Sequence, residues 1–309
     1  MSVKKMVKNL FKLTRVNNTK QKGISDFEME RDRLIMGKIL TNQVKTLGTL
    51  ENILVSEFKV FSQMGDDGII QYLINNIAIP NETFIEFGVE NYSESNTRFL
   101  LMNNNWSGMV IDGSEANVNE IRNSYYYWKY DLKAIHAFID ADNIELLIDE
   151  SGFGIEIGIL SIDIDGNDYW IWKKISTINP IIVIAEFNSV FGIDKPWTVP
   201  YDPSFLRSKS HHSNLFYGSS LLSLCDLAEA KGYYFVGCNS AGNNSYFIRK
   251  DKIGELKILK PEVGYVSSKF AESRSKEGAL TLTRGTDRIK LLKGMEVYNT
   301  RTEKLELIA

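Results

Sequence analysis

Short apolar runs alternate with stretches of helical periodicity through the middle of the chain. They predict seven strands, over residues 83–87, 109–111, 133–139, 159–165, 181–187, 233–238 and 245–249. The run 181–187 is almost continuously apolar, which is typical of a strand covered on both faces. Between the runs, the helical period predicts helices near residues 96–102, 117–127, 144–148, 168–172 and 219–231. This alternation favours an α/β fold.

Two connections interrupt the alternation. Residues 239–244 have the composition of a turn, so the last two strands are expected to form an antiparallel hairpin. Residues 188–218 hold three of the six prolines, namely Pro196, Pro200 and Pro203. A loop of this length inside a compact domain is usually functional.

The ends of the chain differ from its middle, and we expect three parts: a helical leader over 1–57, a main domain over 58–250 with an insertion at 188–218, and a C-terminal extension over 251–309. Residues 1–22 carry seven Lys or Arg, and no acid precedes Asp26. Apolar residues recur there at helical spacing. Such a basic amphipathic helix either lies on an anionic membrane surface or packs against its own domain.

Composition narrows the possible functions. With 309 residues and a net charge of −3, the chain has no global field that would attract nucleic acid. Cys225 and Cys238 form no CxxC unit, which argues against a disulfide framework or a zinc site and fits a reducing cytoplasm. No apolar run is long enough to cross a bilayer and no signal peptide is evident. We expect a cytoplasmic protein, with peripheral membrane contact through the basic leader as an open alternative.

The first strand–helix–strand unit has the order of a nucleotide-binding half. The strand at 83–87 ends in Gly88, Ser95 or Asn96 is expected to cap the next helix, and the strand at 109–111 ends in Asp112. An acid about 20 residues past the glycine is the usual group that binds a ribose diol. The unit therefore predicts a nucleoside ligand.

The turn after Gly88 lacks the further glycines that let a backbone approach a pyrophosphate. Instead Glu86, Glu90 and Glu94 crowd the same place. Carboxylates repel a pyrophosphate and suit a ligand with a sulfonium and an ammonium group. This favours S-adenosylmethionine over NAD or FAD, and the alternative is a structural turn with solvated glutamates.

Several short motifs between Phe58 and Lys250 are specific when taken together. They are Ser62-Gln63 with Asp67-Gly68, Phe84-Ile85-Glu86-Phe87-Gly88, Ser95-Asn96-Thr97, Ile111-Asp112-Gly113-Ser114, Ser161-Ile162-Asp163-Ile164-Asp165-Gly166 and Gly237-Cys238-Asn239-Ser240. On these motifs the chain resembles class I S-adenosylmethionine-dependent methyltransferases, and within them it is similar to the FkbM-like enzymes often encoded with bacterial surface-polysaccharide genes. The resemblance covers about Phe58 to Lys250.

The resemblance implies a Rossmann-like seven-stranded sheet that ends in the hairpin, and S-adenosylmethionine as the small-molecule methyl donor. It implies O-methyl transfer to a sugar hydroxyl in glycan or polysaccharide biosynthesis, with a carbohydrate or a nucleotide-linked sugar as acceptor. The donor-binding positions expected from it are Gln63, Glu86, Gly88, Ser95 and Asn96, then Asp112, Gly113 and Ser114 for the ribose side, and Asp142 or Asn143 near the adenine.

Asp163, at the expected tip of the fourth strand, is where an acceptor would meet the methyl group. Oxygen ligands from Asp163, Asp165, Glu186 and Asn188 would suit Mg²⁺ or Mn²⁺, which would acidify a sugar hydroxyl. The alternative is a helix cap with solvated acids. Without a metal, His211 or His212 is the natural general base, because an imidazole titrates near working pH.

Two further readings stay open. One is a catalytically silent cofactor-fold domain that serves as a scaffold in a polysaccharide assembly complex. The other is an NAD-linked sugar oxidoreductase, which would require the phosphate-binding turn that the sequence lacks.

Overall fold

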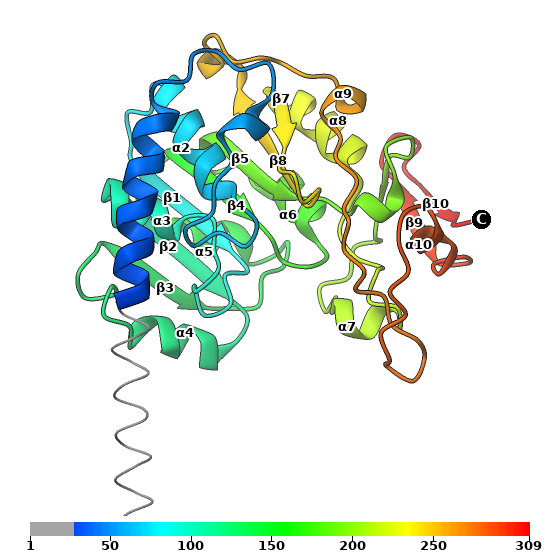
Figure 1. Cartoon of the computed structure of the whole chain (residues 1–309). Helices are drawn as coiled ribbons and strands as arrows, with labels where there is room; N and C mark the ends of the chain where they lie inside the picture. Colours follow the sequence, from blue (N-terminus) through cyan, green and yellow to red (C-terminus); the bar gives the residue numbers. More distant parts are fainter. Residues whose placement is uncertain (1–27) are drawn as a thin grey trace, which may run out of the picture.

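A computed structural model gives the fold and describes residues 28–309 (Figure 1). Its centre is a seven-stranded sheet in the order β3-β2-β1-β4-β5-β8-β7. All strands are parallel except β8, which is antiparallel to both of its neighbours. The strands are β1 (Thr83–Phe87), β2 (Ser107–Asp112), β3 (Leu132–His136), β4 (Glu156–Ile162), β5 (Asn179–Glu186), β7 (Tyr233–Cys238) and β8 (Asn244–Arg249). The expected Rossmann-like sheet with a terminal antiparallel hairpin is confirmed.

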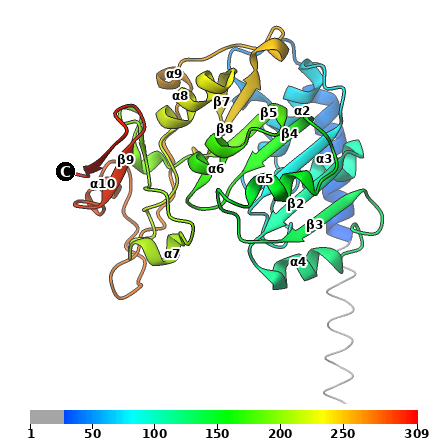
Figure 2. The same ribbon diagram turned by 180° about the vertical axis from the view of Figure 1, so that it is seen from behind.

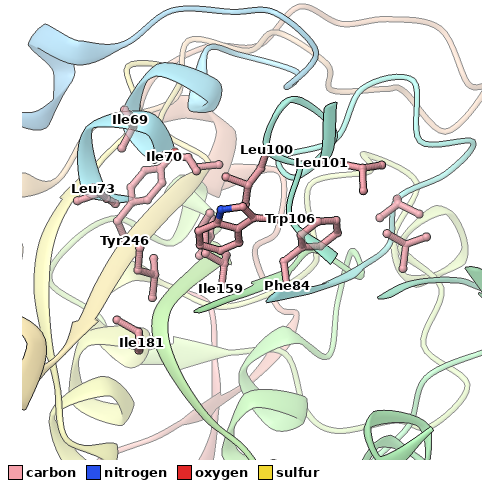
Figure 3. Packing of buried hydrophobic residues seen from close by; sticks show 14 of the residues in the cluster. Ile69, Ile70, Leu73, Phe84, Leu100, Leu101, Trp106, Ile159, Ile181 and Tyr246 are labelled. Carbon is pink, nitrogen blue, oxygen red and sulfur yellow. The ribbon is translucent and has the colours of Figure 1, made fainter. Parts of the chain in front are cut away.

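Helices cover both faces of the sheet (Figures 1 and 2). One face carries helix 28–44, α2 (Asp66–Asn76), α3 (Arg98–Asn104) and α4 (Glu115–Arg122), and the other carries α5 (Ile144–Asp149), α6 (Asp168–Lys174) and α8 (Leu221–Lys231). Successive residues of β1 point to opposite sides, so Phe84 joins one core cluster and Ile85 the other. Figure 3 shows the first cluster, where Trp106 lies between Leu100, Phe84 and Ile159.

The described part of the leader packs against the side of α3. Gly37 lets helix 28–44 approach closely, since a Cβ there would lie 2.7 Å from the ring of Phe99. Arg98 of α3 pairs with Glu30 of that helix at 3.0 Å. Residues 1–27, with the basic segment, lie outside the described residues. No helix within 28–309 has both the length and the apolar character needed to cross a bilayer.

The insertion and the C-terminal extension fold together into a second, three-stranded sheet. Its order is β10-β9-β6, with β6 (Trp197–Thr198) from the insertion and β9 (Glu296–Asn299) and β10 (Lys304–Leu307) from the extension. Val199, Leu215, Leu292 and Val297 form part of its own apolar core. The short helices of these regions and the connections are η1 (Ile53–Ser56), η2 (Ser189–Phe191), α7 (Arg207–Ser210), η3 (Lys250–Lys252), α9 (Pro261–Gly264) and α10 (Asp287–Lys290).

The loop after β1 depends on a glycine, and this dependence can be measured. Gly88 has φ of +71°, and a Cβ there would lie 1.5 Å from the carbonyl oxygen of Asp163. Gly152 has almost the same φ, +72°, with nothing within 4 Å of its Cβ position. We expect Gly152→Ala to lower the free energy of unfolding by about 1–2 kcal/mol, the cost of a left-handed backbone. Gly88→Ala should cost on the order of 4 kcal/mol or more, because two strand ends must also separate.

Urea unfolding of the two variants checks this prediction. Equal losses for Gly88→Ala and Gly152→Ala would show that the β1 and β4 loops are not packed as described.

Candidate functional site

A cavity of about 940 Å³ opens at the carboxyl ends of the central parallel strands. Ligands of open α/β sheets bind at this edge. Among the described residues that line it, eight are acids and one, Arg207, is a base. The acids are Glu86, Glu90, Glu94, Asp112, Asp163, Asp165, Glu186 and Glu272. The expected crowding of the three glutamates around the first turn is therefore present.

Glu86 places its carboxylate at the N-terminus of α3. Oε1 accepts the backbone N–H of Asn96 at 2.8 Å, and Oε2 accepts the backbone N–H of Thr97 at 3.1 Å and its hydroxyl at 2.5 Å. The expected side-chain cap by Ser95 or Asn96 is wrong, because Thr97 is the N-cap residue and Glu86 takes the free N–H groups from the neighbouring strand. Burial raises the pKa of Glu86 to about 7, although the hydrogen bonds from Thr97 and Asn96 lower it.

Asp112 ends β2 beside this turn and is 8% exposed. Its Oδ2 accepts the backbone N–H of Glu90 at 2.7 Å, and its Oδ1 accepts that of Ser114 at 2.8 Å. Asn117 donates to the same Oδ1 at 3.1 Å. Each carboxylate oxygen can accept more than one hydrogen bond, so the held carboxylate can still bind hydroxyl groups from the cavity.

Other expected donor-binding residues divide into two groups. Gln63, Gly88, Ser95, Asn96 and Gly113 line the cavity. The buried hydroxyl of Ser95 has no partner among the described residues, which leaves it available to a ligand.

Ser114, Asp142 and Asn143 do not line the cavity. Ser114 caps α4, where its hydroxyl accepts the N–H of Asn117. Asn143 accepts the N–H of Asp140 at 3.0 Å and donates to the carbonyl of Phe138 at 2.8 Å, so it closes its own turn. Asp142 is exposed. Phe138 and Ile139 do line the cavity, and neither of these apolar residues was among the expected donor-binding positions.

The second half of the cavity holds an acid cluster. Carboxylate oxygens of Asp163, Asp165 and Glu186 lie within 4.8 Å of one another. The strand expected at 159–165 ends at Ile162, so both aspartates lie in the loop after β4, and Glu186 ends β5. Burial, and then repulsion between the neighbouring carboxylates, raises the pKa values of Asp163 and Glu186 well above the usual range. Glu186 Oε2 is buried without a partner among the described residues.

Asn188 does not join this cluster, contrary to the expected ligand set. Its side chain donates to the carbonyls of Leu215 and Tyr217, both at 2.9 Å, and accepts the N–H of Val190 at 2.9 Å. Every polar atom of this buried amide is thus used to hold the insertion in place, so Asn188 has a structural role.

Arg207, from the insertion, is the principal residue that the sequence did not single out. Its guanidinium donates to Asp165 Oδ1 at 2.7 Å and to the carbonyl of Asn214 at 3.0 Å. It also pairs with Glu272 of the extension at 3.0 Å and lies 3.6 Å from the centre of the Tyr217 ring. Arg207 therefore ties the β4 loop, the insertion and the extension together. The only available signal was a single arginine within a long proline-rich insertion.

The two insertion histidines do not line the cavity. Their rings are in contact, with centres 4.1 Å apart and planes tilted by 46°, and His211 Nδ1 lies 2.8 Å from the hydroxyl of Ser213. Burial, with His212 and Lys276 nearby, lowers the pKa of His211. The structure thus brings Asp163 to the cavity and leaves His211 and His212 outside its lining, and the expected histidine base has no structural support.

No protein-family model matches the chain, and no protein among those with curated descriptions matches it. Among solved structures it is similar to the N-terminal domain of EvdMO1 with SAH bound, at 11% identity and a TM-score of 0.39, over 71% of this chain and 94% of that one. It is also similar to an S-adenosylmethionine-dependent methyltransferase from Clostridium acetobutylicum, at 12% identity and 0.37 over 60% and 90%.

A third similar structure is the O-methyltransferase from Bacillus cereus in complex with SAH, at 13% identity and a TM-score of 0.34 over 54% of this chain and 72% of that one. Structural similarity at this level of identity does not establish the activity or the substrate of the chain.

The raised pKa of Glu86 makes stability depend on pH in a defined direction. The folded state holds this proton more tightly than the unfolded chain, whose carboxyl has the ordinary value of 4.5. The resulting stability is fully present below about pH 4.5 and is lost as the pH rises to about 7. We expect Glu86 to account for a decline in the free energy of unfolding of about 3 kcal/mol across this window, and Glu86→Gln to lack it.

Urea unfolding of wild type and variant at several pH values between these limits measures the difference. Glu94→Gln is the control, because its side chain is 54% exposed and should leave the slope unchanged. The same slope in wild type and Glu86→Gln would contradict the prediction.

Proposed function

We propose that the protein is an S-adenosylmethionine-dependent methyltransferase that transfers a methyl group to a sugar hydroxyl in bacterial glycan or polysaccharide biosynthesis. The observation that carries the choice of cofactor is the carboxylate of Glu86 on the N-terminus of α3. A helix N-terminus is the usual binding site for the phosphates of a dinucleotide, and here an acid of the chain itself fills it. The motif resemblance to class I methyltransferases supports the same cofactor.

In this proposal the donor spans the first half of the cavity. Its ribose hydroxyls bind Asp112, and its adenine rests on Phe138 and Ile139. The cationic methionine end lies toward Glu86 and Gln63, where Ser95 offers a hydroxyl that has no partner within residues 28–309. Opposite charges favour this orientation, because a sulfonium and an ammonium group meet carboxylates rather than phosphates.

The acceptor would occupy the second half, between Asp163, Glu186 and the segment 270–280 of the extension. Four acids and one arginine line that half. Such a field disfavours a phosphate near the reacting hydroxyl, so we propose a carbohydrate acceptor rather than the diphosphate part of a nucleotide-linked sugar. Its hydroxyl oxygen attacks the sulfonium methyl in line, the carbon–sulfur bond breaks, and S-adenosylhomocysteine leaves.

The hydroxyl proton must be taken up as the new carbon–oxygen bond forms. We propose the carboxylates of Asp163 and Glu186 as the general base, because both line the cavity and burial raises both pKa values well above the usual range of a carboxyl group. Arg207 would position Asp165 beside them. His211 and His212 lie outside the cavity lining and are not part of this proposal.

Three carboxylates with close oxygens also fit a divalent ion, and Glu186 Oε2 has no hydrogen-bond partner in the described part of the chain. Asp163, Asp165 and Glu186 would hold Mg²⁺ or Mn²⁺, although Asp165 already pairs with Arg207. Such an ion, when bound, acidifies the acceptor hydroxyl. Positioning of the acceptor and removal of its proton rest on the side chains described above.

Donor binding can be tested without knowing the acceptor. A hydrogen bond to a charged group is worth about 1.5–3 kcal/mol, so Asp112→Asn should weaken binding of S-adenosylhomocysteine about tenfold or more. Asp142→Asn, at an exposed position outside the cavity, is the matched control. Isothermal titration calorimetry with S-adenosylhomocysteine, and in parallel with NAD, measures both. Unchanged affinity in Asp112→Asn would remove the ribose assignment, and tight NAD binding would favour the oxidoreductase.

Transfer itself can be tested with methyl-labelled donor and a panel of neutral glycosides, uronic acids and nucleotide sugars. We expect alkali-stable label in a neutral carbohydrate. Asp163→Asn should lower turnover at least about a hundredfold, as for loss of a general base, while affinity for S-adenosylhomocysteine stays within about twofold. His211→Ala is the control and should keep its activity, and chelation followed by added Mn²⁺ tests the ion.

Donor binding without label in any carbohydrate would contradict the proposed acceptor and favour the silent scaffold. Equal losses of turnover in Asp163→Asn and His211→Ala would instead support the histidine pair as the general base.

A further inference from the structure

The outward side of helix 28–44 carries an apolar ridge. Met29, Ile35, Met36 and Ile39 are each about half exposed, between 49% and 60%. Most exposed residues of a surface helix are polar, and four large apolar side chains along three turns are unusual. The opposite side of the helix is the packed one, since Gly37 and Val44 are buried there. Within residues 28–309, nothing covers the ridge.

The charges around the ridge are mainly basic. Arg31, Arg33 and Lys38 of the helix are exposed, and the chain immediately before it holds seven Lys or Arg and no acid until Asp26. Glu30, the acid on the inner side, is paired with Arg98. Glu28 and Asp32 are the exposed acids of this helix. Asp32 lies within the ridge, so the ridge suits a hydrated interface better than a fully apolar one.

We propose that this ridge, together with the basic segment before it, binds the protein to the surface of an anionic lipid bilayer. Apolar side chains of an amphipathic helix rest at the boundary of headgroups and acyl chains, and one such signal alone binds weakly. A neighbouring basic cluster strengthens binding to anionic headgroups with each Lys or Arg that lies close to the surface. The ridge and the cluster are adjacent along the chain, so both can contact one surface at the same time.

A second copy of the chain is the competing occupant of the ridge. Pairing two ridges would bury Asp32, 70% exposed here, together with Arg31, whose guanidinium lies 4.0 Å from its carboxylate, and removing an ion pair from water is costly. At a headgroup surface the same ion pair stays in water. The composition of the ridge therefore favours a lipid surface.

The test uses the full chain and two kinds of vesicle, one of phosphatidylcholine and one of phosphatidylcholine with phosphatidylglycerol. We expect cosedimentation with the anionic vesicles only, weakened at least tenfold between about 0.1 M and 1 M salt, where the Debye length falls from about 10 to 3 Å. Ile35→Glu with Ile39→Glu should lower the affinity at least tenfold, and so should Lys4→Gln with Lys5→Gln and Lys8→Gln.

Leu146→Glu is the matched control, because Leu146 is 73% exposed on α5, on the opposite face of the sheet (Figure 2). It should bind vesicles as the wild type does. Light scattering of each variant in solution and its affinity for S-adenosylhomocysteine report assembly and folding separately.

Equal binding to both vesicles, no binding, or undiminished binding of the Ile35→Glu and Ile39→Glu variant would overturn the proposal. A dimer that this variant dissociates would overturn it as well, because the ridge would then be an interface between two copies.

Discussion

The carboxylate of Glu86 on the N-terminus of α3 is the contact on which the rest of the site depends. It satisfies two backbone N–H groups that would otherwise lack partners, and so it sets where the helix begins. The same contact removes an anion-binding site from the cavity and replaces it with negative charge. In the proposed function, the carboxylate that completes the start of the helix therefore also selects the charge of the ligand that the cavity binds.

The acid-rich second half of the cavity is stabilised by contacts with other parts of the chain. Buried carboxylates repel one another and lose hydration, and both effects raise the pKa values of Asp163 and Glu186. Arg207 supplies the single positive charge among the described lining residues, and Glu272 of the extension fixes that arginine from the far side. The proposed acceptor side thus combines the ends of β4 and β5 with the insertion and the extension, whereas the proposed donor side is built around the ends of β1 and β2.

The pattern of apolar runs was enough to predict the seven strands, the hairpin and the acids at the strand ends, because these follow from local periodicity and from the polarity of one sheet edge. Glu86 and Asp112 were predicted for the same reason. Contacts between distant segments could not be predicted. The partners of Asn188 lie in the 215–217 segment, and Arg207 meets Glu272 across 65 residues of sequence. Neither pairing produces a periodic pattern in the sequence. The histidine pair was a candidate general base because the sequence does not show which residues surround it.

The small second sheet also has a consequence for the order in which the protein matures. Strand β6 pairs with β9, so Trp197 can pair only after Asn299 has been synthesised. Arg207 can likewise form its ion pair only after Glu272 has been synthesised. All seven strands of the main sheet are synthesised before either partner, since the last of them ends at Arg249. During translation, the half of the cavity around Glu86 and Asp112 can assemble as soon as the main sheet closes. The opposite wall includes the segment 270–280, so it forms only after that segment has been synthesised.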